Sequence, residues 1–258
     1  MTAAGDGTSW AQTNTQLIRN LRGHGWSEDD LARVRRAHVF SGLVTGGLLR
    51  HTGRSVHAHL AGVADVLASL DHDPTLLEAA FLHTAFGRGA HRGMLSVQRR
   101  YNRRLVEREY GPSMASLLER FAVLNVGGLP RVNGGTWVDP DVAVLQLANV
   151  VEELDTSAEF LTPHHRKDLM EQALEGARLA REAGSQRLAD LLEASAANGA
   201  AISTSEPPWV DMRIGQPLRV SVGWFPPGAR WFAVMLPRRL VRLVNLSWLR
   251  TRLSADRS

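Results

Sequence analysis

The sequence predicts an all-α protein, an HD-like bundle of helices followed by a C-terminal extension rich in tryptophan and arginine. Apolar residues recur at spacings of three and four through most of residues 9–194, which is the period of amphipathic helices. Capping residues and prolines mark helix starts, as at Asp73-Pro74 and Thr162-Pro163. Residues 209–258 have a different composition, with prolines that prevent a long helix before Arg238.

The chain divides into four predicted parts. Residues 1–26 hold a small, polar start, expected to be disordered, and one short helix. Residues 27–195 form the helical domain, residues 196–208 a linker that ends in Pro-Pro, and residues 209–258 the extension. The helices expected in the first two parts span residues 9–21, 27–43, 55–70, 74–86, 96–110, 113–123, 139–155, 162–183 and 186–194.

The composition excludes several kinds of site and partner. The chain has no cysteine, which excludes disulfides, thiolate metal sites and a cysteine nucleophile. Nine arginines against two aspartates give residues 209–258 a net charge of +7, so with a total of +4 the first 208 residues carry −3. The net positive charge therefore comes from the extension, and we do not expect the whole protein to bind nucleic acid.

The N-terminus lacks a basic region followed by an apolar run, and no stretch approaches the ~18 apolar residues of a spanning helix. We expect a cytoplasmic protein, with peripheral attachment to a membrane as the alternative.

Two histidines, His59 and His83, lie on two consecutive predicted helices that carry strong apolar faces. Ser55 precedes the first of these helices, and the second ends at Gly87. Imidazoles on neighbouring helices of one core could bind a single metal ion. The alternative is that both are ordinary half-buried side chains.

The sequence RHTGRSVHAHLAGVADVLA, followed by LLEAAFLHT, resembles the HD superfamily of helical metal-dependent phosphohydrolases. It is most similar to the hydrolase domain of the bifunctional ppGpp synthetase-hydrolases, and the resemblance covers about residues 30–155. It implies an all-α fold with His59 and His83 as ligands of a divalent metal. It further implies that Arg50, in the turn with His51, contacts a nucleotide ligand; the alternative is a solvated arginine at a helix end.

The departures from the family concern its carboxylates. The aspartate expected after the second histidine is Thr84, the last aspartate ligand is matched by Asn149, and the catalytic acids are matched by Gly87 and Arg88. Two neutral histidines with these neighbours would bind magnesium or manganese poorly. They could bind zinc with a third donor, for which His51, His57 and His91 are candidates.

Four further features of the sequence concern residues that could contribute to a binding site. If the HD-like fold is correct, Glu152 or Glu153 faces the pocket beside Asn149; otherwise both belong to a solvated helix end. Arg54 has no counterpart in the family's motif. Adjacent helical residues point about 100° apart, so His164 and His165 are not expected to share one ion. The glycine-rich, basic segment 87–94 could bind an anion through its backbone amides, or simply connect two helices.

The extension holds four of the seven tryptophans, and residues 238–253 can form a helix with arginines on one side. Such a helix suits an anionic membrane surface. It equally suits docking on a protein partner or on the chain's own helical domain, and nucleic acid is the least favoured partner.

These observations leave three hypotheses of function. The first is an HD-like protein that has lost phosphohydrolase chemistry and binds a small ligand, such as a nucleotide or phosphate, through Arg50, His51, Thr84 and Asn149. The second is an active metal-dependent hydrolase or other HD-type enzyme with a rearranged ligand set around His59 and His83. The third is a scaffold or membrane-surface protein that acts through its basic extension.

Overall fold

The computed structural model describes residues 10–45, 49–50, 52–86 and 96–202, with side chains described except at 96–99 and 125–127. The described residues belong to one compact unit. The predicted disordered start, the candidate ligands His51 and His91, the segment 87–94 and the whole C-terminal extension lie outside the described residues.

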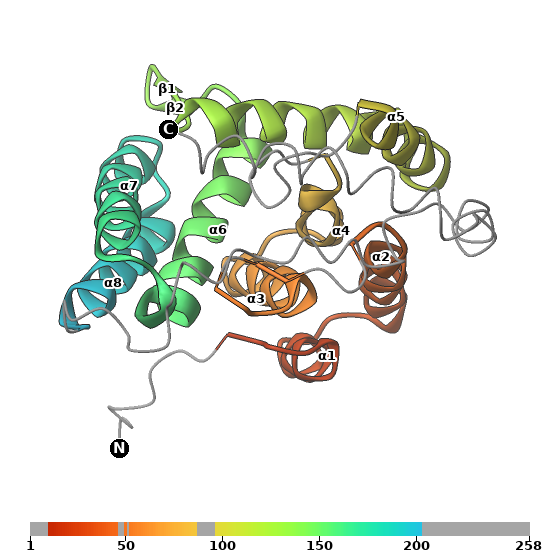
Figure 1. Ribbon diagram of the computed structural model, residues 1–258, viewed down its shortest axis with the longest axis horizontal. Coiled ribbons are helices and arrows are strands. Elements are labelled where there is room, and N and C mark those ends of the chain that lie inside the picture. Colours follow the sequence, from red (N-terminus) through yellow and green to blue (C-terminus); the bar gives the residue numbers. More distant parts are fainter. Residues whose placement is uncertain (1–9, 46–48, 51, 87–95, 203–258) are drawn as a thin grey trace, which may run out of the picture. The chain divides into compact units, whose positions relative to one another are not determined.

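The all-α prediction is confirmed (Figure 1). The described residues form eight α-helices, two short 3-10 helices and a two-residue antiparallel hairpin in which Val132 pairs with Trp137. The elements are α1 (Asn14–Gly23), α2 (Glu28–Thr45), α3 (Val56–Ser69), α4 (Pro74–Leu82), η1 (His83–Ala85), α5 (Ser96–Gly127), β1 (Val132–Asn133), β2 (Thr136–Trp137), α6 (Pro140–Ser157), η2 (Ala158–Phe160), α7 (Pro163–Glu182) and α8 (Gln186–Ala201).

Two helices, α3 and α6, are central to the packing. Helix α3 packs against α1, α2, α4 and α6, and its residues from His59 to Ala68 are all buried. Helix α6 packs against α3, α5, α7 and α8 and is buried from Val142 to Leu154 except at Asn149. Because both helices are buried on nearly every side, their polar residues need partners inside the protein.

The helix starts follow from the capping residues. Ser55 accepts a hydrogen bond from the amide of Ala58, and Asp73 accepts from the amides of the first turn of α4. Thr162 caps α7 in the same way, through the amide of His165. Each oxygen satisfies an amide that has no partner within its helix, which is why these starts were predictable.

Three of the differences between the observed and the predicted helices have a clear structural description. Helix α1 begins at Asn14 and not at residue 9, because Thr13 is the cap, and Trp10 is buried outside the helix. The predicted break at Gly111 is a kink with φ of 83° inside α5. Helix α8 continues to Ala201, into the segment predicted as linker.

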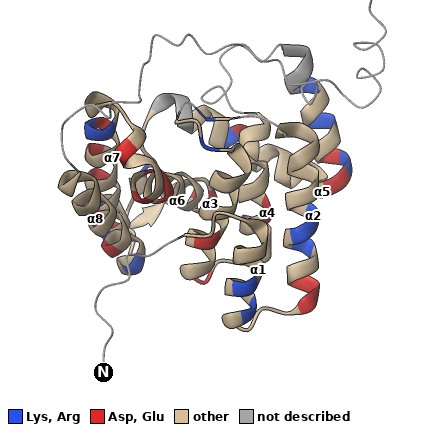
Figure 2. Ribbon diagram, turned by 60° about the horizontal axis from the view of Figure 1, so that its bottom comes forward, with Lys and Arg blue, Asp and Glu red and all other residues tan. Residues whose placement is uncertain are grey.

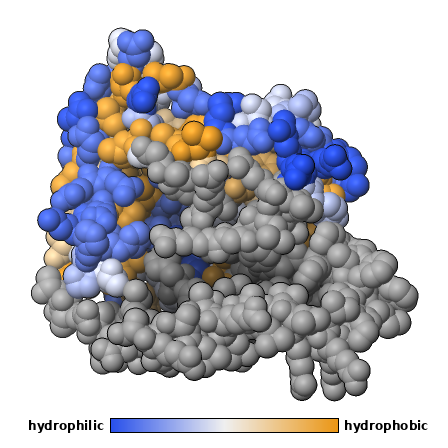
Figure 3. All heavy atoms as spheres, turned by 45° about the horizontal axis from the view of Figure 1, so that its top comes forward, coloured by the Kyte–Doolittle hydropathy of each residue, from blue (hydrophilic) through white to orange (hydrophobic). Residues whose placement is uncertain are grey.

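Charged residues lie along α1, α2 and α5 (Figure 2). Several apolar side chains, among them Val39 and Val123, are exposed, and Figure 3 shows orange areas between blue ones on the face that it draws. Within the described part of the chain, none of the helices has both the length and the apolar character needed to span a bilayer.

Helices α6 and α7 approach closely at Gly176. A Cβ atom added there would lie 2.5 Å from Cδ2 of Leu147, which is fully buried. We expect Gly176→Ala to lower the free energy of unfolding by about 1–3 kcal/mol, because the core must shift to accept the methyl group. Denaturant unfolding measures this. Gly23→Ala is the control, because nothing lies within 4 Å of its added Cβ; equal losses in the two variants would contradict the packing argument.

Candidate functional site

The two predicted histidines meet in the core. His59 lies in the first turns of α3 and His83 directly after α4, and their Nε2 atoms are 3.3 Å apart. Their side chains are almost completely buried, and the rings are tilted edge to face. The two imidazoles that were predicted to share one site therefore lie close together.

The other ring nitrogens show where the protons lie. Nδ1 of His83 is 2.7 Å from the backbone oxygen of Ala80, which can only accept, so this nitrogen donates. Nδ1 of His59 is 2.5 Å from Oε2 of Glu152 on α6. Both imidazoles therefore carry their proton on Nδ1, provided that Glu152 is ionised.

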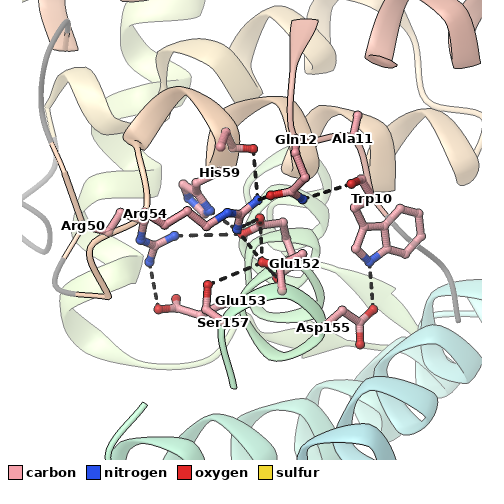
Figure 4. Close-up of polar contacts among 12 residues, drawn as sticks. Trp10, Ala11, Gln12, Arg50, Arg54, His59, Glu152, Glu153, Asp155 and Ser157 are labelled. Atoms are coloured by element: carbon pink, nitrogen blue, oxygen red, sulfur yellow. Dashed lines mark hydrogen bonds and ion pairs between the residues drawn. The ribbon is translucent and has the colours of Figure 1, made fainter. Parts of the chain in front are cut away.

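Glu152 is ionised because guanidinium groups and a hydrogen-bond donor surround it. Burial by itself raises the pKa of this fully buried carboxyl, but the hydrogen bond from His59 and the charges of Arg54 and Arg50 outweigh burial and lower the pKa. Arg54 donates to Oε1 of Glu152, while Oε2 accepts from His59 (Figure 4). Each carboxylate oxygen thus has a donor of its own.

The two Nε2 atoms of His59 and His83 therefore form an electrostatically unfavourable pair. Burial lowers the pKa of both His59 and His83, and the positive charge of Arg50 lowers that of His59 further. Both rings are then neutral near pH 7, with their protons on Nδ1, and two unprotonated Nε2 atoms face each other at 3.3 Å. Two lone pairs so close repel each other unless a proton or a metal cation lies between them.

The residues present fit a transition-metal ion in part. Two Zn–N bonds of ~2.0–2.1 Å at a tetrahedral angle put the nitrogens about 3.3–3.4 Å apart, in agreement with the observed separation. Metal-bound histidines usually donate their second N–H to a carboxylate or a backbone carbonyl, as His59 and His83 do here. Among the described residues no group of three or more His, Asp or Glu surrounds such a position, so further ligands would have to come from solvent or a bound molecule.

Gly62 makes room for Glu152. A Cβ atom on this residue of α3 would lie 2.7 Å from Cγ and 2.8 Å from Oε1 of Glu152. Any larger residue would push the carboxylate away from His59 and Arg54, so the glycine permits the buried network at the crossing of α3 and α6.

Arg50 forms a second ion pair beside the first. Its Nη2 is 2.8 Å from Oε1 of Glu153, and its Nη1 is 4.0 Å from Oε2 of Glu152. His165 on α7 lies 3.9 Å from Glu153, and this carboxylate raises the pKa of His165. The alternative of a solvated Arg50 is wrong, as is the alternative of a solvated helix end at Glu152 and Glu153, because all three side chains are at most 12% exposed.

The remaining predicted ligand residues have different surroundings. Thr84 is buried, and its hydroxyl has no hydrogen-bond partner among the described residues. Asn149 is half-buried on α6. It shares a face with Gln146 and Glu153, at spacings of three and four, and the buried Oε1 of Gln146 also has no partner in the described part of the chain. These groups stay candidates for binding a ligand.

Other residues considered from the sequence lie apart from the histidine pair. His57, a candidate third donor, packs beside His38, and its Nε2 is 3.4 Å from Oγ1 of Thr45. Nδ1 of His164 lies 3.6 Å from Asp168, whereas Nε2 of His165 lies 3.9 Å from Glu153.

The hydrogen bonds of Arg54 and Gln12 in this network were not predicted from the sequence. Arg54 donates to Glu152, Thr156 and Gln12, which are far from it in the chain. The signal that points to this place is Gly62, a glycine inside an otherwise regular apolar helix, which indicates a close approach of another group.

Comparison with known proteins adds one match. A family model described as "Domain of unknown function (DUF6817)" matches residues 44–125, less than half of the chain. The matched segment contains both histidines and Arg54, but it ends before α6, which supplies Glu152. No curated protein matches the chain.

The buried histidines predict a pH dependence. Burial lowers the pKa of His38, His59, His72 and His83, whereas the unfolded chain takes up these protons near pH 6.5. The unfolded state then binds more protons, so the free energy of unfolding should fall as the pH drops below about 6.5, by up to ~1.4 kcal/mol per pH unit for each histidine. His165, whose pKa is raised, and the buried Asp65 and Asp155 act in the opposite sense.

Denaturant unfolding of chelator-treated protein between pH 5 and 8 measures this slope. His38→Gln should make the slope shallower, and Val39→Gln, an exposed neighbour, should leave it unchanged. Equal slopes in wild type and His38→Gln would contradict the argument.

Proposed function

We propose that this protein binds a divalent ion of the zinc class between His59 and His83 and uses it to bind a small anionic molecule. The observation that carries the proposal is the pair of Nε2 atoms, 3.3 Å apart, in two rings whose Nδ1 atoms each face an acceptor oxygen. Imidazole nitrogen favours zinc and related transition metals over magnesium or calcium. When bound, such an ion supplies a Lewis acid that polarises an oxygen of the ligand.

The charges around the pair favour an anionic ligand. The carboxylates of Glu152 and Glu153 are already balanced by the guanidinium groups of Arg54 and Arg50. A divalent ion would add two positive charges to a buried region, and an uncompensated charge there is costly. A phosphate or carboxylate group that completes the coordination would balance it.

Binding is better supported than hydrolysis. A phosphohydrolase needs a base for its attacking water, and the two carboxylates nearest to the histidines each pair with a guanidinium group. The resemblance to the HD superfamily supports the same conclusion, since Thr84 and Asn149 replace the family's carboxylate ligands. An active hydrolase with a rearranged ligand set is the second hypothesis, and phosphate release from a phosphomonoester by the zinc-loaded protein would favour it.

The third hypothesis, a surface role of the C-terminal extension, is independent of the histidine pair. It depends on residues 209–258, which lie outside the described residues, and is tested by sedimentation of the full chain with anionic vesicles.

The metal proposal predicts about one bound ion per chain. Protein purified without chelator and dialysed against zinc should hold about one ion by elemental analysis, and His59→Ala or His83→Ala should lose it because one imidazole donor alone binds weakly. His38→Ala is the matched control, a half-buried histidine that packs beside His57, and should keep the ion. A wild type that holds no ion after dialysis would rule out the metal site.

The ligand proposal predicts that phosphate stabilises the zinc-loaded protein. Inorganic phosphate should raise its melting temperature, by the equivalent of about 2.7 kcal/mol when phosphate is at 100 times its Kd. The shift should be absent from metal-free protein and from His59→Ala, and smaller in Arg50→Met. Arg187→Met removes an exposed arginine that pairs with Asp71 and should keep the full shift. The same shift in metal-free protein would place the anion elsewhere.

A further inference from the structure

Arg54 joins three parts of the chain. From the turn before α3, its Nη1 donates to Glu152 and Thr156 of α6, and its Nη2 donates to Oε1 of Gln12 and to the backbone oxygen of Ala58, 3.3 Å away (Figure 4). The side chain is 13% exposed. A guanidinium group is planar, so binding Gln12 at one end fixes the orientation in which the other end reaches Glu152.

Gln12 is itself held in one orientation. Its Nε2 donates to the backbone oxygen of Trp10 at 3.0 Å, and its backbone amide donates to Oε1 of Gln16 at 2.8 Å. With the amide nitrogen in use, the oxygen faces Arg54. Gln12 therefore presents an acceptor to the guanidinium group and no donor.

The segment that carries Gln12 is fixed to α3 and α6. Nε1 of Trp10 donates to Asp155 on α6 at 2.7 Å (Figure 4), and the amide of Ala11 donates to Asp65 on α3 at 2.9 Å. Trp10 and Ala11 are buried although they precede the first helix. Residues 10–12, here named the N-terminal segment, are thus part of the packed structure between these two helices.

We propose that the N-terminal segment is a positioning element of the histidine pair: Gln12 orients Arg54, Arg54 holds Oε1 of Glu152, and Oε2 of Glu152 keeps the proton of His59 on Nδ1. A glutamate released from Arg54 can rotate away from His59, and the ring is then free to carry its proton on Nε2, facing His83. That tautomer offers no lone pair to a metal ion. The consequence for metal binding rests on the proposed function, but the effect on the tautomer does not.

The test uses metal-free, full-length protein with nitrogen-15 in its histidine rings. Two-dimensional NMR separates protonated from unprotonated ring nitrogens, and the signals of His59 are identified by their loss in His59→Asn. The wild type should show Nδ1 protonated and Nε2 unprotonated. Gln12→Ala and Arg54→Met should add a population with the proton on Nε2, larger in Arg54→Met, whereas Gln12→Glu keeps an acceptor oxygen and should retain the wild-type signals.

Two matched controls separate positioning from general loss of stability. Arg33→Met removes a guanidinium that is paired with the buried Glu78 and not with Glu152, and Ser27→Ala removes the oxygen that accepts from the amide of Asp30 at the start of α2. Both should lose stability and keep the wild-type signals of His59. The proposal is overturned if Gln12→Ala leaves the tautomer unchanged, or if the controls shift it equally. Because Gln12→Ala alters only a half-buried side chain, we expect this variant to fold, and it tests the proposal even if Arg54→Met does not fold.

A zinc titration then separates this proposal from the preceding one. If the wild type binds zinc, Arg54→Met should bind it about 10–100-fold more weakly, the usual effect of removing an outer-shell partner of a metal-bound histidine. If the wild type does not bind zinc but the tautomer shifts as expected, the metal function fails and the positioning role stands. If zinc binds equally well to wild type and Arg54→Met, the positioning role fails and the metal site stands.

Discussion

The hydrogen bond between the buried carboxylate of Glu152 and Nδ1 of His59 is the interaction on which the centre of the molecule depends. It joins α6 to α3, and it exists because Gly62 leaves space and Arg54 supplies the compensating charge. A buried carboxylate is costly, and removing one partner of such a pair commonly destabilises a protein by about 3–5 kcal/mol. The contacts of the N-terminal segment, the turn at Arg54 and the crossing of α3 and α6 are therefore linked through one charged group.

The second ion pair, Arg50 with Glu153, extends this network toward α7. Adjacent residues of α6 point in different directions, so Glu152 faces α3 while Glu153 turns toward Arg50 and His165. The two pairs together are neutral. Their arrangement keeps the imidazoles of His59 and His83 uncharged, because burial opposes protonation and no carboxylate charge is left unbalanced beside them.

Much of the fold follows from short-range signals that are visible in the sequence. Ser55, Asp73 and Thr162 cap helices because a side-chain oxygen meets amides two or three residues away. The meeting of His59 and His83 was also predictable, since the two helices are consecutive. The start of α1 was not, because Trp10 has the apolar character of a helix face but packs outside the helix, beside Asp155.

The partners of the site could not be predicted, because they are distant in the chain. Arg54 meets Glu152 across 98 residues and Gln12 across 42, and no spacing rule connects such positions. The family resemblance identified the positions where carboxylates are missing. It also indicated that Glu152 or Glu153 faces the pocket, but not that Glu152 holds the imidazole of His59 through Nδ1.

The role of Glu152 bears on whether the region around His59 and His83 is the remnant of a site that has lost its function. A site without function has no need for buried charges, since replacing an ion pair by well-packed apolar residues is often neutral or stabilising. Here a glutamate, an arginine and two histidines occupy a region where apolar side chains would suffice for packing. The arrangement orients both histidines toward each other with their lone pairs in contact, which costs free energy in the absence of a cation. The cation of the proposed function would remove that cost, and its site would then account for the polar network in the core.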